Sequence, residues 1–198
     1  MINLKEFAKE IHENAVAHGW WEKDVPPEET IALIHSEWSE ALEEYRAGRP
    51  IVWHNCNVDC DVCEQCKGCY YHVNAEPEKC EYRGKPEGIA VELIDGCIRI
   101  LDYLAHKDED VELLISKSNP LLWCDGDVVS TAKIVSTLHY HTAIAHESCL
   151  GIDASRLEYA MSMAFAWIEA NGLDPVTILR EKHEYNKTRP YKHGGKIC

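Results

Sequence analysis

The stretch that decides the fold is PEETIALIHSEWSEALEEYRA, residues 27–47. Its apolar residues recur at the i, i+3, i+4 spacing of one helix face, and they are Ile31, Ile34, Trp38, Ala41, Leu42 and Tyr45. Pro27 suits a first helical position, and Gly48 and Pro50 end the pattern. The stretch therefore predicts a long amphipathic helix with one face turned toward a core.

The same spacing recurs along most of the chain. It predicts five further helices, at residues 3–18, 87–105, 128–147, 153–170 and 175–186, with a polar connection at 107–127. No β-hairpin signal and no internal repeat is found. A chain of 198 residues can bury one substantial core. We therefore expect a single all-α domain over residues 1–198.

Composition restricts the function. The formal net charge is −14, and a chain this acidic is repelled by a nucleic-acid backbone, so no nucleic-acid polymer is expected as a partner. No run of 18 apolar residues is present, so no membrane span is expected. The N-terminus MINLKEFAKEIHENA has no features of a signal peptide. A cytoplasmic location with reduced thiols is therefore predicted.

Carboxylates lie beside the apolar face of two predicted helices. At about 100° per residue, Glu37, Glu40 and Glu44 fall in one strip, whereas Glu43 points to the other side, toward solvent. Glu92 and Asp95 occupy a similar flank of the helix at 87–105. If the two helices pack through their apolar faces, these carboxylates meet at one seam.

Like charges at such a seam are costly unless cations compensate them. Hard oxygen ligands suit Mg²⁺, which also shares the phosphate oxygens of a substrate. The sequence thus favours Mg²⁺ as a cofactor, with a water oriented for attack and with Glu40 or Glu44 as the group that takes its proton. The alternative is a solvated acidic face without chemistry.

Three longer segments carry a family resemblance. They are LIHSEWSEALE at 33–43, KPEGIAVELID at 85–95 and KHEYNKTRPYKHG at 182–194. The Glu-x-x-Glu and Glu-x-x-Asp motifs in their context, followed by this tail, resemble the MazG-like branch of the all-α nucleoside triphosphate pyrophosphatases. The gap between the two motifs is longer here than in that family, because residues 53–82 intervene.

The resemblance implies a MazG-like helical bundle that forms homodimers or higher homo-oligomers. It implies Mg²⁺-dependent cleavage of a nucleotide substrate between the α and β phosphates, which yields a nucleoside monophosphate and pyrophosphate. By motif position, the Mg²⁺ ligands would be Glu37, Glu40, Glu92 and Asp95. The residues that approach phosphate or sugar would be Lys182, Tyr185, Asn186, Lys187 and Arg189.

The tail is also unusual in charge. Residues 180–196 hold six lysines and arginines against Glu181 and Glu184. In so acidic a chain, this local reversal fits a phosphate clamp. The alternative is a solvated, frayed end of the chain.

Residues 53–82 are predicted to be a cysteine-rich, metal-binding insertion. Repeated Cys-x-x-Cys spacing in a reducing compartment is typical of a structural Zn²⁺ site, which takes four ligands. The candidate ligands, of which a subset would bind Zn²⁺, are Cys60, Cys63, Cys66, Cys69 and Cys80. An iron–sulfur cluster is the alternative, since the spacing partly resembles that of ferredoxins.

Two other classes of protein compete with the pyrophosphohydrolase. A di-iron helical bundle would use Glu-x-x-His pairs, and the chain contains none. A non-catalytic zinc-containing interaction module would leave the acidic helices as scaffold only.

Overall fold

The computed structural model describes residues 3–55, 84–147 and 151–195. The part described is predominantly helical, which confirms the predicted helical character. The main helices are α1 (Leu4–Ala17), α2 (Pro27–Arg46), α3 (Ile89–His106), α4 (Thr131–Ala145), α5 (Ala154–Ala170) and α6 (Pro175–Lys187). A 3₁₀ turn, η3 (Pro120–Leu122), and a one-turn helix, α7 (Lys192–Gly195), complete the helical elements.

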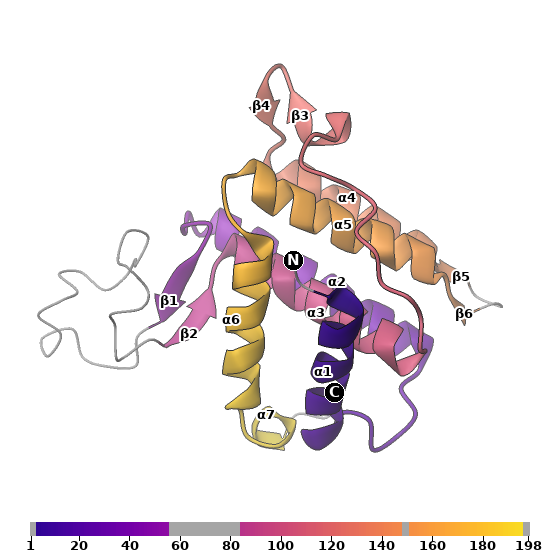
Figure 1. Cartoon of the computed structure of the whole chain (residues 1–198). Coiled ribbons are helices and arrows are strands. Elements are labelled where there is room, and N and C mark those ends of the chain that lie inside the picture. The colour runs from indigo at the N-terminus through magenta and orange to yellow at the C-terminus, as the bar shows by residue number, and fades with distance from the viewer. Residues whose placement is uncertain (1–2, 56–83, 148–150, 196–198) are drawn as a thin grey trace, which may run out of the picture.

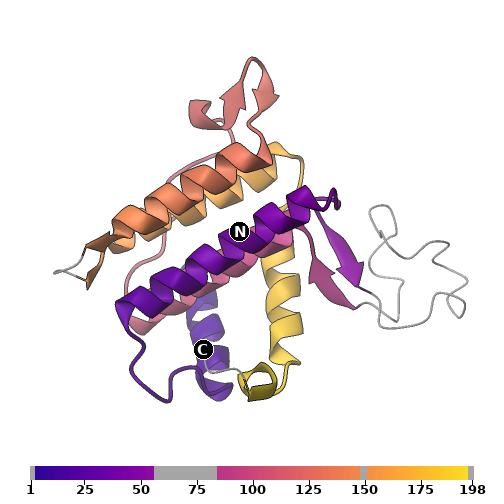
Figure 2. The same ribbon diagram turned by 180° about the vertical axis from the view of Figure 1, so that it is seen from behind.

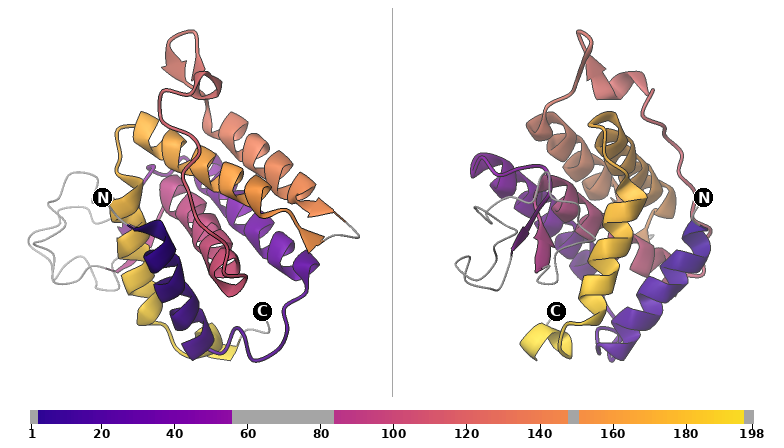
Figure 3. Two further views of the ribbon diagram at one scale, coloured as in Figure 1. Left: turned by 45° about the vertical axis from the view of Figure 1, so that its right-hand side comes forward. Right: turned by 60° about the vertical axis from the view of Figure 1, so that its left-hand side comes forward.

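The six main helices form three layers of two, stacked in the order α4–α5, α2–α3 and α1–α6 (Figures 1 and 3). Helix α2 contacts α4, and α3 contacts α5, between the upper two layers. Helices α1 and α6 both pack on α3 from the other side. Viewed from behind, α2 runs alongside α4 (Figure 2). Helix α3 is therefore the centre of the molecule, and twelve of its eighteen residues are buried.

The contact between α2 and α3 is unusually close at one point. The fully buried ring of Trp38 lies against Gly96, where an added Cβ would come within 2.3 Å of the ring. The Trp38 indole N–H donates to the Thr142 hydroxyl of α4 at 2.9 Å. Glycine at position 96 thus lets one tryptophan join three helices, and it fixes the seam that carries the predicted carboxylates.

The helix bounds follow the predicted ones to within a few residues. Asp153 and Asp174 cap α5 and α6, and their side chains accept hydrogen bonds from the first-turn N–H groups of Ser155 and Val176. Helix α4 begins only at Thr131, because the Ser130 hydroxyl caps it there.

The expectation of no β-hairpin was wrong. The described residues form three antiparallel pairs, each of two or three residues a strand: β1 (Trp53–Asn55) with β2 (Lys85–Glu87), β3 (Trp123–Cys124) with β4 (Asp127–Val128), and β5 (His146–Glu147) with β6 (Gly151–Ile152). Strands this short carry no alternating pattern. The turn Asp125-Gly126 has φ values of 55° and 93°, and such a dipeptide is itself a hairpin signal.

The β1–β2 pair lies on either side of the cysteine-rich segment in the sequence, and its strand β2 contacts α3 and α6. Asn55 pairs with Lys85 at the end of the two strands that adjoins the cysteine-rich segment. The predicted Zn²⁺ ligands Cys60, Cys63, Cys66, Cys69 and Cys80 lie outside the described residues. Within the described ranges, no helix combines the length and the apolar content needed to cross a membrane.

Candidate active site

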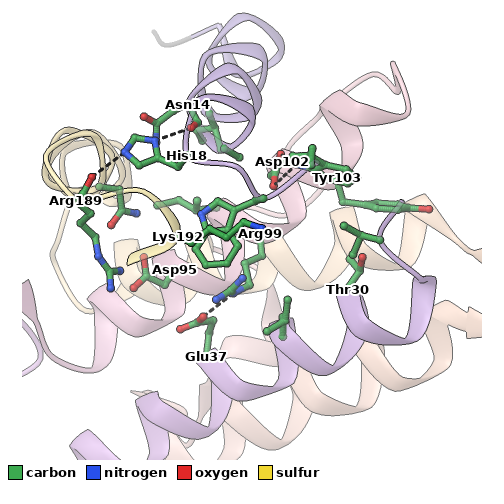
Figure 4. Close-up of a pocket in the computed structure, with 18 of the residues that line it drawn as sticks. Asn14, His18, Thr30, Glu37, Asp95, Arg99, Asp102, Tyr103, Arg189 and Lys192 are labelled. Carbon is green, nitrogen blue, oxygen red and sulfur yellow. Dashed lines mark hydrogen bonds and ion pairs between the residues drawn. The ribbon is translucent and has the colours of Figure 1, made fainter. Parts of the chain in front are cut away.

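A cavity of about 540 Å³ opens beside the α2–α3 seam. Helix α1, the loop between α1 and α2, and the end of α6 with the residues that follow it form most of the rest of its lining (Figure 4), and Lys85 of β2 contributes as well. Its lining includes Glu37, Glu40, Glu92 and Asp95. We call these four carboxylates the acidic wall.

Three members of the acidic wall converge. Glu37, Glu40 and Glu92 each offer a carboxylate oxygen, and these oxygens lie within 4.8 Å of one another. Glu37 and Glu92 are buried, whereas Glu40 is exposed. The predicted meeting of the two motifs at one seam is therefore present for these three side chains.

Glu37 is held by a cation from the facing helix. The Arg99 guanidinium donates through Nε to Glu37 Oε1 at 2.6 Å (Figure 4). Burial raises the pKa of Glu37 above its ordinary value, although Arg99 opposes the rise. Arg99 itself lines the cavity and is 39% exposed, so it can reach a ligand there.

Glu92 and Asp95 share a different cation. Burial raises the pKa of Glu92 to about 9, and the neighbouring Asp95 charge adds to the rise. Asp95 Oδ2 pairs with Lys182 Nζ at 2.7 Å, and the lysine side chain is fully buried. Burial alone would lower the pKa of Lys182, but Asp95 and Glu92 together outweigh it and raise that pKa.

The acidic wall has an excess of negative charge. Its four carboxylates have two directly paired cations, Arg99 and Lys182. With every group ionised, two negative charges would be left without a partner at a largely buried seam. Burial is the main cause of the raised pKa values of Glu37 and Glu92, and the charges of the neighbouring carboxylates add to the rise.

The next two glutamates along α2, Glu43 and Glu44, point elsewhere. Glu44 lies outside the cavity lining, where it accepts from the Trp53 indole at 2.8 Å and pairs with Arg49 at 3.3 Å. Glu43 is exposed, as predicted, and pairs with Arg46. Of the two proposed general bases, the structure therefore brings only Glu40 into the carboxylate cluster.

The tail residues divide in the same way. Asn186 and Arg189 line the cavity, and Asn186 Oδ1 is buried with no hydrogen-bond partner among the described residues. Lys182 lies beneath the acidic wall and outside the lining. Half-buried Tyr185 is also outside it, and Lys187 pairs with Glu10 and Glu184.

Sequence reasoning missed several cations of the pocket. Lys23, Lys85, Arg99 and Lys192 line it, and they come from four different segments of the chain. Arg99 lies seven residues after the Glu92 motif position, on the same face of α3, so helical spacing could have found it. Lys192 lies in the basic run at 180–196, which indicated a phosphate clamp without specifying this side chain, and no local pattern indicates Lys23 or Lys85.

An aromatic group lines the α1 side of the cavity. The Trp21 ring stacks on His106 with centroids 3.9 Å apart, and its N–H donates to Asp102 at 3.0 Å. His12 also bonds Asp102, at 2.6 Å. Burial raises the pKa of Asp102, while its bond to His12 opposes the rise. These contacts fix the Trp21 ring at the edge of the pocket.

Comparisons with protein-family models, with curated proteins and with solved structures find no match to this chain. The resemblance to the MazG-like enzymes therefore remains a hypothesis that depends on the motif residues themselves.

Proposed function

We propose that the chain is a Mg²⁺-dependent nucleoside triphosphate pyrophosphohydrolase, similar to the MazG-like enzymes. It would cleave between the α and β phosphates and release a nucleoside monophosphate and pyrophosphate. The observation that supports this proposal is one pocket that combines three converging carboxylates, surplus negative charge on the acidic wall and several cationic side chains in its lining.

The acidic wall fits a divalent cation. Carboxylate oxygens are the ligands that Mg²⁺ prefers, and Glu37, Glu40 and Glu92 present theirs together. A dication would offset the two negative charges that Arg99 and Lys182 leave without a partner. Asp95 would join the ligand set only by loosening its contact with Lys182, so it is the outlying member. When bound, Mg²⁺ would neutralise phosphate charge and help to orient the attacking water.

The protein's own residues have separate roles in this proposal. Glu40, which is exposed, would accept the proton of water as the water oxygen bonds to phosphorus and the bridging P–O bond breaks. Arg99 and Arg189 would bind phosphate oxygens, which guanidinium groups contact in pairs. Lys182 would hold Asp95 in place and would not touch the substrate.

The rest of the cavity suits a nucleoside. Trp21 and Tyr103 offer aromatic surface on which a base can stack. The buried Oδ1 of Asn186 lacks a donor among the described residues, and a sugar hydroxyl would supply one. A nucleotide therefore matches the pocket better than inorganic polyphosphate, which needs neither feature.

Pyrophosphate release from a panel of ribo- and deoxynucleoside triphosphates, with and without Mg²⁺, tests the proposal. We expect release that requires Mg²⁺ and stops at the monophosphate. Absence of release from every nucleotide would favour the zinc-containing interaction module instead.

Two further parts of the proposal concern assembly and the insertion. We propose a homodimer or higher homo-oligomer, as the family resemblance implies, and light scattering that gives a monomer mass would refute it. We also propose structural Zn²⁺ in the insertion. Elemental analysis of protein purified without chelator would then find about one Zn²⁺ per chain, and iron with visible absorbance would identify a cluster instead.

A further inference from the structure

The segment that follows α6 is fastened to the end of α1. Gly19 has a φ of +83°, and its missing side chain makes room for the Tyr191 ring, which an added Cβ would meet at 2.4 Å. The Lys192 N–H donates to the His18 carbonyl at 3.1 Å, and Lys192 Nζ pairs with Glu22 at 2.8 Å. The Tyr191 hydroxyl bonds the same glutamate.

His18 is at the centre of this junction. Its Nδ1 lies 2.8 Å from the carbonyl oxygen of Asn14, and its Nε2 lies 2.9 Å from that of Arg189 (Figure 4). A carbonyl oxygen can only accept a hydrogen bond, so both ring nitrogens must donate. Only the imidazolium cation carries both protons. The geometry therefore requires a charged ring.

The end of α1 faces the ring, and charged groups of both signs lie on the elements around it. Asn14 is in the last turn of α1, where the carbonyl end of a helix attracts cations. The charged groups on the facing elements are Arg189 and Lys192 on the C-terminal segment and Glu22 on the loop after α1, with Glu22 engaged by Lys192. Two carbonyls and the helix end thus face the ring directly.

The junction determines where two pocket cations lie. Arg189 and Lys192 both line the cavity, and we call this pair the C-terminal clamp. Lys192 has a φ of +45°, a left-handed conformation that a lysine adopts only where its surroundings impose it. Among the described residues, the bond from the His18 ring to the Arg189 carbonyl is the side-chain hydrogen bond that connects the clamp to the end of α1. Its loss would leave Arg189 without this connection.

We propose that His18 is a positioning residue for the C-terminal clamp. The ring, which donates to two carbonyl oxygens, holds Arg189 and Lys192 at the pocket, where they bind an anionic ligand. Loss of either carbonyl bond loosens the clamp, and affinity for a phosphate-bearing ligand then falls. The ligand class rests on the proposed function, whereas the clamp and its histidine do not.

Two readouts independent of hydrolysis test the junction. Nitrogen-15 spectra of histidine-labelled protein should show both His18 ring nitrogens protonated near neutral pH, with the signal assigned by its loss in His18→Gln. The Lys192 amide should be protected from hydrogen exchange in the wild type and lose protection in His18→Gln at the same pH. A His18 ring with one proton beside a fully protected Lys192 amide would overturn the proposal, whatever the enzyme does.

Kinetics then test the consequence. Loss of one hydrogen bond from a charged donor predicts a rise in KM on the order of tenfold in His18→Gln, with kcat changed much less. His146→Gln, at the far end of α4, is the matched control. Gly19→Ala should raise KM by displacing Tyr191, and a wild-type KM in both His18→Gln and Gly19→Ala would refute the role.

Discussion

The acidic wall and the C-terminal clamp face the same cavity but are built in opposite ways. The acidic wall stands on α2 and α3, where helical spacing and close packing at Gly96 place the carboxylates. The clamp lies beyond the end of α6 and is held by contacts to residues more than 160 positions away in the chain. The first depends on regular secondary structure, and the second depends on a few specific long-range bonds.

This contrast predicts different responses to mutation. Changes in the acidic wall should alter stability and metal binding together, because its charges are buried within the core. Changes in the clamp should alter ligand affinity with little effect on stability, because the clamp is near the surface.

The largest effect is expected from the buried cation beneath the acidic wall. Lys182→Met keeps the length of the side chain but leaves Asp95 and Glu92 without their counter-charge. Removing one partner of a buried pair typically costs about 3–5 kcal/mol in the free energy of unfolding. Denaturant unfolding of the metal-free protein measures this loss.

Lys187→Met is the matched control on the same helix. Lys187 is 35% exposed and pairs with Glu10 and Glu184 at the surface, so its loss should cost less than about 1 kcal/mol. If both lysine variants lose the same free energy of unfolding, Lys182 does not act as the counter-charge of the acidic wall.

The next effect concerns catalysis. Glu40→Gln keeps the size of the side chain and removes a charge from the cluster, so turnover should fall by a factor on the order of a hundred or more. Glu43→Gln, on the exposed side of α2, should retain normal turnover. The assignment fails if both variants lose activity equally or if neither loses any.

A smaller effect is expected in the pH dependence of stability. The pKa of Glu92 is raised to about 9 in the folded protein from an ordinary value near 4.5, so the folded state binds a proton that the unfolded state has released. Stability of the metal-free protein should therefore fall as pH rises between about 5 and 9, by up to about 1.4 kcal/mol per pH unit.

Glu92→Gln should remove this part of the slope, because glutamine does not titrate. Saturating Mg²⁺ should also reduce it, since a metal-bound carboxylate is already ionised. Thermal or denaturant unfolding at several pH values provides the comparison, and an unchanged slope in Glu92→Gln would argue against a buried, protonated Glu92.

The same contrast explains what the sequence could and could not predict. Helical spacing located all six main helices, and it brought Glu37, Glu40 and Glu92 to one seam. It also included Glu44 in the strip, because a helical wheel cannot show that the Trp53 indole and Arg49 would bind that carboxylate.

The tail shows where local patterns stop being informative. A basic run identified the segment but not which side chains enter the pocket, since Lys182 is buried by its bond to Asp95 and Lys187 is turned toward Glu10. The role of His18 depends on two carbonyl oxygens, one of them 171 positions away, and no sequence pattern records such a contact.

Linked binding of Mg²⁺ and nucleotide is the most direct test of the central claim, that the acidic wall and the C-terminal clamp form one site. Calorimetry with a triphosphate analogue that cannot be cleaved between the α and β phosphates would measure each affinity with and without the other ligand. If the two form one site, Mg²⁺ strengthens binding of the analogue, and the analogue strengthens binding of Mg²⁺ by the same factor. Glu40→Gln should weaken this coupling, while Glu43→Gln should preserve it. Independent binding of the two ligands, or no binding of either, would contradict it.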